Sequence, residues 1–144
     1  MSKQQFPIQD DLNESQLDRD WFIQNLVYLA NRRIGLGVTL TLGGQIVTGQ
    51  LISGQRYFEL LKEQFSNLSD VDEINELMSF FFDNQMKVYD NPESIGSEKT
   101  SYIHLENAKV IGAQGSIPTN DTFLWRGKIS SISGISVGSL SAAN

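Results

Sequence analysis

His104 is the residue of this chain best suited to acid–base chemistry, because it is the single histidine and there is no cysteine. A histidine can act as a general base near neutral pH. Here His104 alternates with Ile103 and Leu105, and such alternation is typical of one face of a strand. No Ser-His-Asp arrangement can be assigned around it. We therefore interpret His104 as a packed or surface polar residue and predict a protein without enzymatic activity.

The remaining polar residues give little indication of a cofactor or a metal. Without cysteine, disulfides and thiolate metal sites are excluded. Asp70, Asp72 and Glu73 are close in sequence, but they lie at the start of a predicted helix, where carboxylates interact favourably with the helix dipole. Gly43 and Gly44 fit neither the P-loop nor the dinucleotide-binding spacing. We predict no cofactor and no metal.

Trp125 and Arg126 are the best candidates for recognition of a partner. Alternation along residues 122–129 places Phe123 and Trp125 on one strand face, with Leu124 and Arg126 on the other. Trp and Arg are enriched among the residues that dominate binding at protein interfaces. Trp125 could equally fill the core of the sheet, and the sequence leaves both readings open.

Three consecutive phenylalanines, Phe80 to Phe82, span roughly 200° of a helix, so at least one must face outward or toward another element. Burial on two sides is one reading, and a docking or self-association surface is the other. The buried face of the same helix is predicted to comprise Val71, Ile74, Leu77, Met78 and Phe81.

Composition indicates a folded protein in one domain. The 144 residues are 40% hydrophobic and 10% aromatic, which is enough for one sizeable core. Eleven basic against seventeen acidic residues give a net charge of −6, which argues against nucleic-acid binding because that depends on neutralised phosphates. No apolar run is long enough to span a bilayer. The start of the chain lacks a signal-peptide pattern, so we expect a cytoplasmic protein.

Periodicity predicts the order of elements. A helix is expected from Ser15 to about Arg33, with Phe22, Leu26 and Leu29 on its buried stripe and an exit turn at Gly35. Strands at 36–42 and 45–53 form a hairpin. Two helices follow between 54 and about 89, then a loop at 90–100. Further strands are expected at 101–111, at 122–132 with a break or bulge at Gly127, and at 135–140.

We predict an α+β fold in a single domain spanning 1–144. It comprises the N-terminal helix and a strongly bent antiparallel five-stranded sheet or small barrel, with a helical insertion at 54–91 between strands two and three. The amino-acid sequence of residues 38–51 is similar to the first motif of Sm-like barrels. Residues 1–13 are predicted to be a flexible leader, and residues 141–144 a flexible tail.

Three segments carry a family resemblance: IVTGQLISGQRYFEL at 46–60, YIHLENAKV at 102–110 and TFLWRGKI at 122–129. In their order and amino-acid sequence they resemble the gas vesicle accessory protein U family. The resemblance covers roughly 36–65 and 101–140. The chain departs from the family in its longer N-terminal helix and in the phenylalanine-rich segment at 76–89.

The resemblance implies a non-enzymatic accessory protein that acts by binding or self-association in gas vesicle assembly or clustering. Its partners would be the gas vesicle shell or other gas vesicle proteins, and a homo-oligomer pairing through strand edges is expected. Such an oligomer would present repeated copies of the proposed partner-binding residues, which are Tyr102, His104, Trp125 and Arg126. An Sm-like RNA-binding or oligomerisation module is the alternative, and a hydrolase centred on His104 is less favoured.

Overall fold

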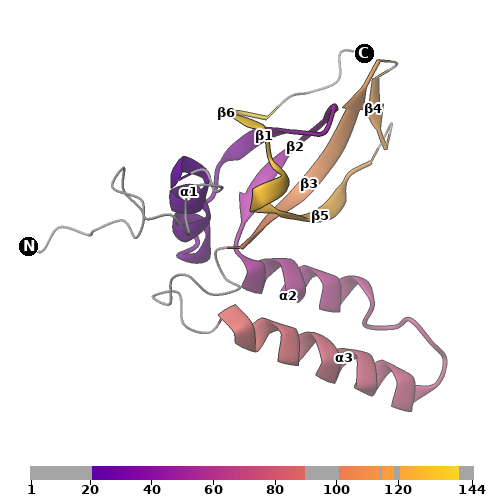
Figure 1. Cartoon of the computed structure of the whole chain (residues 1–144). Helices are drawn as coiled ribbons and strands as arrows, with labels where there is room; N and C mark the ends of the chain where they lie inside the picture. Colours follow the sequence, from indigo (N-terminus) through magenta and orange to yellow (C-terminus); the bar gives the residue numbers. More distant parts are fainter. Residues whose placement is uncertain (1–20, 90–100, 114, 119–120, 140–144) are drawn as a thin grey trace, which may run out of the picture.

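The computed structural model describes residues 21–89, 101–113, 115–118 and 121–139 (Figure 1). The predicted α+β class, with an N-terminal helix and with helices between the second and third strands, is confirmed. The elements, in chain order, are α1 (Trp21–Asn31), β1 (Gly37–Leu42), β2 (Gln45–Ile52), α2 (Gly54–Gln64), α3 (Asp72–Met86), the 3-10 turn η2 (Lys87–Tyr89), β3 (Tyr102–Gly112), β4 (Gly115–Ile117), β5 (Phe123–Lys128), the 3-10 turn η4 (Ile129–Ser131) and β6 (Gly134–Val137). The predicted leader, the predicted tail and the predicted helix start at Ser15 lie outside the described residues.

Strands β1 and β2 form the predicted hairpin. Gly43 and Gly44 both have positive φ, 51° and 87°, as the two central residues of a type I′ turn require. The ladder then pairs Leu42 with Gln45 and continues to Gly37 opposite Gln50. Glycine is the residue that adopts these angles at least cost, so the turn determines the register of the hairpin.

The sheet has six strands and not the predicted five. Its order is β4-β3-β2-β1-β6, and β5 also pairs with β3. Strand β4 pairs with the Val110–Gly112 end of β3, while β5 pairs with its Tyr102–Ala108 end, so the two strands share one edge. All of these pairings are antiparallel, as predicted. The additional strand β4 lies where the glycine- and proline-containing stretch 112–120 predicted only a loop.

The prediction of a strongly bent or barrel-like sheet of the Sm type is wrong. The sheet is neither closed nor strongly curled, because among the described residues no ladder joins β5 to β6. The predicted strand at 122–132 ends at Lys128, and residues Ile129–Ser131 form the η4 turn. This turn carries the chain across to β1, where β6 pairs along Thr41 to Val38. Residues in a 3-10 turn do not form inter-strand backbone hydrogen bonds, so η4 does not join β5 to β6 and the sheet stays open.

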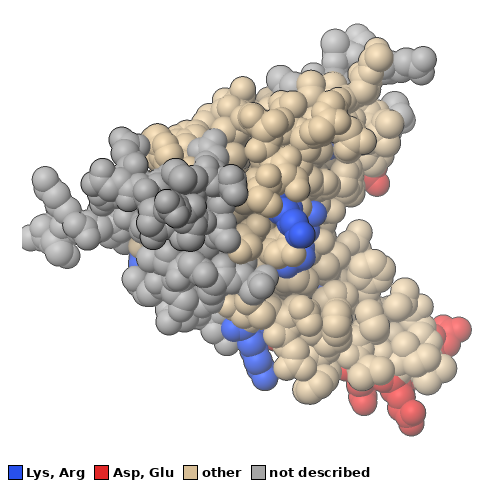
Figure 2. Space-filling view, in the orientation of Figure 1, with Lys and Arg blue, Asp and Glu red and all other residues tan. Residues whose placement is uncertain are grey.

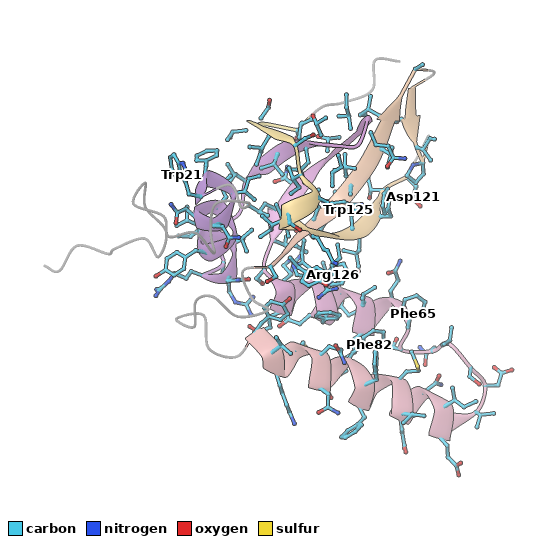
Figure 3. All side chains as sticks on the ribbon, in the orientation of Figure 1. Trp21, Phe65, Phe82, Asp121, Trp125 and Arg126 are labelled. Carbon is cyan, nitrogen blue, oxygen red and sulfur yellow. The ribbon has the colours of Figure 1, made fainter. Side chains whose placement is uncertain are left out.

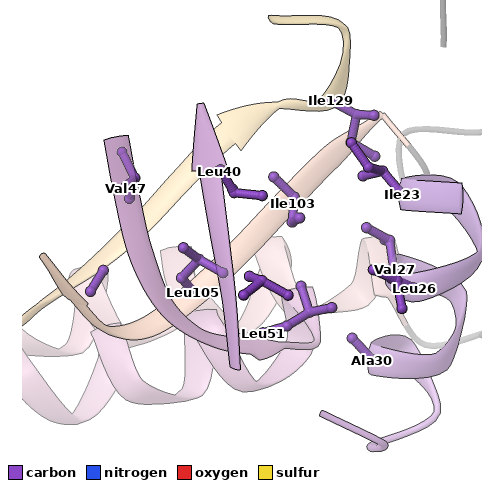
Figure 4. Packing of buried hydrophobic residues seen from close by; sticks show 12 residues of the cluster. Ile23, Leu26, Val27, Ala30, Leu40, Val47, Leu51, Ile103, Leu105 and Ile129 are labelled. Atoms are coloured by element: carbon purple, nitrogen blue, oxygen red, sulfur yellow. The ribbon is translucent and has the colours of Figure 1, made fainter. Parts of the chain in front are cut away.

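Helix α1 covers one face of the sheet and forms the main core with it. Figure 4 shows Ile23, Leu26, Val27 and Ala30 of α1 directed at the apolar side chains of the strands. The strand residues of this core include Leu40, Val47, Leu51, Ile103 and Leu105, and Ile129 of the η4 turn joins them. The predicted stripe is only partly right, because Leu26 is buried but Phe22 is 38% exposed. The buried stripe begins one position later, at Ile23.

Helices α2 and α3 form a hairpin on the other side of the sheet, and α2 lies between the sheet and α3 (Figure 1). Ser53 caps α2 by accepting a hydrogen bond from the backbone N–H of Arg56 at 3.0 Å, as expected for an N-cap serine. A second, smaller core joins Phe58 of α2 to Phe82 of α3 and Tyr89 of η2. The chain thus has two apolar clusters, one on each face of the sheet.

The predicted buried face of α3 is wrong except at Met78. Of the three phenylalanines, Phe82 is buried at 6% exposure, whereas Phe80 and Phe81 are 62% and 49% exposed. Met78 packs against the second core. The other predicted core residues of this helix are exposed: Val71, Ile74 and Leu77. Helix α3 therefore contacts α2 through a narrow face and leaves a broad apolar surface uncovered within the described chain.

Candidate partner-binding site

The β3–β5 ladder decides where the four candidate residues lie. It pairs His104 with Arg126 and Leu105 with Trp125. Because side chains alternate across a strand, Tyr102, His104 and Arg126 share the face that α2 covers. Trp125 lies on the opposite face, toward the main core. The structure therefore brings three of the four candidates together and separates the fourth from them.

Arg126 is held by two of its neighbours. Its Nε–H donates a hydrogen bond to Nε2 of His104 at 3.1 Å. Its guanidinium lies over the ring of Tyr102, with Cζ 3.7 Å from the ring centroid, within the range of a cation–π contact. The ring of Phe58, on α2, is 6.0 Å from the same atom. Although anchored, Arg126 is exposed, and Figure 3 shows it between the sheet and α2.

His104 is buried among aromatic rings. It is 2% exposed, with the ring of Tyr57 centred 4.8 Å away and that of Tyr89 edge-on at 5.6 Å. Burial, and secondly the positive charge of Arg126, lower the pKa of His104 to about 3. The imidazole is therefore neutral at physiological pH, and acceptance at Nε2 places its proton on Nδ1. A buried lone pair that already binds Arg126 is poorly placed for general-base chemistry.

We call Tyr102, His104, Arg126, Tyr57 and Phe58 the Arg126 cluster. Burial raises the pKa of Tyr57, an effect that the Arg126 charge partly opposes, so the phenol stays neutral. The two α2 members were missed by sequence reasoning as part of a site. Their pattern within 46–60 was noted, but strand alternation alone does not reveal which helix packs on which strand face.

Further charged pairs lie on the same side of the sheet. Arg56 of α2 forms an ion pair with Glu106 of β3 at 3.4 Å. Arg33, after α1, forms one with Glu59 at 3.5 Å. Arg33, Arg56 and Glu106 line a pocket of about 340 Å³, together with backbone and side chains of β2. Exposed ion pairs of this kind contribute little to the stability of the fold. What they add to this region is a set of charged groups at the surface.

Charge is unevenly distributed over the face of the molecule that Figure 2 shows. In Figure 2, Lys and Arg side chains gather in the hollow where the sheet meets the helical hairpin. Asp and Glu side chains gather at the far end of the hairpin, where α3 begins with Asp72 and Glu73. The exposed Arg126, which Figure 3 places between the sheet and α2, lies at the same junction.

Trp125 packs against the main core and is partly buried. Its indole lies against Gly127, two residues along the same strand face, where a Cβ would collide with the ring. Of the two readings that the sequence left open, the geometry places Trp125 in the packing of the core face. Its contact with any partner stays a prediction.

The described residues also bear on a metal site and on a membrane-spanning helix. No group of three or more histidine and acidic residues in this part of the chain is arranged to hold a metal ion. None of the described helices is long and apolar enough to cross a membrane.

Comparison with known protein families gives a match over most of the chain. A family model described as Gas vesicle protein GvpU-like matches residues 20–140. No curated protein and no solved structure matches the chain significantly. The matched range extends from α1 to the end of β6, so it includes the Arg126 cluster and both helices of the hairpin.

Proposed function

Since this chain belongs to the family of GvpU-like gas vesicle proteins, we propose that it is a non-enzymatic accessory protein that binds gas vesicle proteins in the cytoplasm. By binding the shell or another vesicle component, it would act in the assembly or the clustering of gas vesicles. The family match over 20–140 is the observation that supports this proposal most strongly. The open sheet removes the barrel geometry on which the alternative of an Sm-like RNA-binding module was based.

The Arg126 cluster is the proposed contact with the vesicle. An arginine already held in place loses less conformational entropy when it binds a partner. Its Nε is used by His104, so the two Nη groups are the donors available to a partner's carboxylate. Tyr102 provides the aromatic surface beneath the guanidinium. His104, being buried, would contribute by positioning Arg126 and not by direct contact.

The test is co-flotation of the purified protein with purified gas vesicles. We expect wild type to float with the vesicles and Arg126→Ala to bind at least roughly tenfold more weakly, as for a central interface arginine. Lys128→Ala is the matched control, because Lys128 is an exposed cation on the same strand. It should change binding by no more than about twofold, since rim charges contribute little.

Other outcomes would overturn this proposal. If wild type does not float with vesicles at any salt concentration, direct vesicle binding is wrong. If Arg126→Ala and Lys128→Ala lose vesicle binding to the same extent, the attraction is a general one between charges and not a contact at Arg126. A salt-dependent shift of labelled RNA would support the RNA-binding alternative instead.

Trp125→Ala separates the two readings of that residue. If Trp125 packs in the core, this change removes a large apolar side chain and should lower the free energy of unfolding by up to about 5 kcal/mol. If Trp125→Ala remains as stable as wild type but no longer floats with vesicles, then Trp125 contacts the partner directly.

A further inference from the structure

Helix α3 carries an apolar stripe that nothing else in the described chain covers. Ile74, Leu77 and Phe81 are 44%, 66% and 49% exposed, and Phe80 beside them is 62% exposed. Their spacing of three and four residues places Ile74, Leu77 and Phe81 on one side of the helix. Phe82, about 100° round the helix from Phe81, packs on α2. Exposed apolar surface of this extent marks an interaction site.

The stripe has the pattern of a helix that pairs with another helix. Ile74 and Phe81 occupy equivalent positions one heptad apart, and Leu77 lies between them at the second apolar position of the heptad. Asn84 follows Leu77 at the equivalent position in the next heptad.

The charges along the stripe identify its partner. Glu73, Phe80 and Lys87 are spaced one heptad apart, so they lie in a row along one flank of the stripe. Glu73 and Lys87 are exposed. If two copies of this helix paired in parallel, this row would lie beside Met78 and Gln85 of the other copy, so Glu73 and Lys87 would have no opposite charge to face. In an antiparallel pair, each Glu73 faces the Lys87 of the other copy.

We propose that this face binds a second copy of the chain, α3 against α3 in antiparallel orientation, with the two-fold axis close to Phe80. Leu77 of each copy then packs against Phe81 of the other, and the two Phe80 rings meet near the axis. Ile74 of each copy lies opposite Asn84 of the other. The interface is isologous, so each favourable contact occurs twice and the assembly closes at a dimer.

This inference deepens the proposed function, because a dimer carries two Arg126 clusters and can therefore hold two vesicles. Dimerisation is tested in the absence of vesicles, so its failure can be distinguished from failure of vesicle binding. The first experiment is sedimentation-equilibrium analysis of the full chain across a wide range of concentration. We expect a monomer–dimer equilibrium in wild type and a monomer for Leu77→Lys.

A matched control exists for Leu77→Lys. Ile117, on β4, has the same 66% exposure as Leu77 but lies outside α3. Ile117→Lys should dimerise as wild type does. A wild type that stays monomeric throughout would overturn the proposal, and so would equal dimerisation of wild type and Leu77→Lys.

The orientation is tested by exchanging the flanking charges. Glu73→Lys and Lys87→Glu should each weaken the dimer, because each places like charges opposite one another. The double variant restores two opposite-charge pairs and should regain most of the wild-type affinity. If the double variant dimerises more weakly than either single variant, the antiparallel alignment is contradicted.

Crosslinking gives an independent test, because the chain has no cysteine of its own. A cysteine introduced by Phe80→Cys should react with its copy through a short thiol-specific crosslinker. A cysteine at Ile74→Cys should not, because antiparallel pairing separates the two positions by roughly 15 Å, or ten residues at helical rise. Crosslinking at residue 74 but not at residue 80 would overturn the arrangement.

Discussion

At the scale of single residues, His104 determines how the candidate site is built. It is buried between the sheet and α2, and it accepts the hydrogen bond that holds Arg126. A neutral histidine suits this position, because a protonated one would place a second positive charge beside the guanidinium. The histidine that looked like a candidate base is therefore a structural acceptor.

The lowered pKa of His104 predicts a pH dependence of stability. Between pH 6.5 and about 3, the unfolded histidine binds a proton that the folded one does not. The free energy of unfolding should therefore fall by roughly 1.4 kcal/mol for each pH unit of acidification through this range. His104→Gln keeps a neutral acceptor but does not titrate. The free energy of unfolding, measured with urea at several pH values, should therefore depend less on pH in His104→Gln than in wild type.

The same claim has a direct spectroscopic check, because His104 is the only histidine. Its imidazole proton resonances in the folded protein should not move between pH 8 and 5. A titration midpoint close to 6.5 in the folded state would contradict the burial of the ring and its bond to Arg126.

Strand alternation predicted correctly which of these side chains share a strand face. It separated Trp125 from Arg126 and grouped Tyr102 with His104, and the ladder between β3 and β5 confirms both. Alternation could not show that Tyr57 and Phe58 pack on this face, since that depends on how α2 crosses the sheet. It also could not give the register that sets Arg126 opposite His104.

At the scale of elements, the junction between α1 and β1 was predicted only in part. Gly35 was expected to provide the exit turn, but Arg33 has the positive φ, 67°. Gly35 is required for a different reason, because a Cβ there would collide with the backbone carbonyl of Leu51. Sequence spacing identifies a glycine near a helix end, but it does not distinguish a turn from a close approach between strands.

Gly35→Ala should therefore destabilise the fold. The added methyl group meets main-chain atoms of a core strand, so the backbone must shift, at a cost of about 1–3 kcal/mol. Gly134→Ala is the matched control, since a Cβ at Gly134 has its nearest neighbour at 3.8 Å. Chemical denaturation should show a change within about 0.5 kcal/mol for the control. Equal stability of Gly35→Ala and wild type would contradict the packing of this junction.

Helix α3 shows why amphipathic spacing alone was insufficient. The sequence identified a helix with an apolar stripe, and the helix is present. Periodicity does not say whether such a stripe packs within its own chain or against another. The same limit applies to the sheet, where alternating residues at 122–132 predicted one long strand and the chain instead turns at Ile129 to reach β1.

At the scale of the whole molecule, the two proposed surfaces lie on different elements. The Arg126 cluster lies where the sheet meets α2 (Figure 3), whereas the stripe is on α3, which lies beyond α2 (Figure 1). One surface can therefore bind a vesicle while the other binds a second copy. A dimer of this form is bivalent, and bivalency is what clustering of particles requires.

The most direct test of this account is a clustering assay on purified gas vesicles with wild type, Leu77→Lys and Ile117→Lys, in which vesicle-bound protein and vesicle aggregation are both measured. We expect all three proteins to bind vesicles, and only wild type and Ile117→Lys to cluster them. If Leu77→Lys clusters vesicles as well as wild type does at equal bound protein, the account of a dimeric linker is wrong.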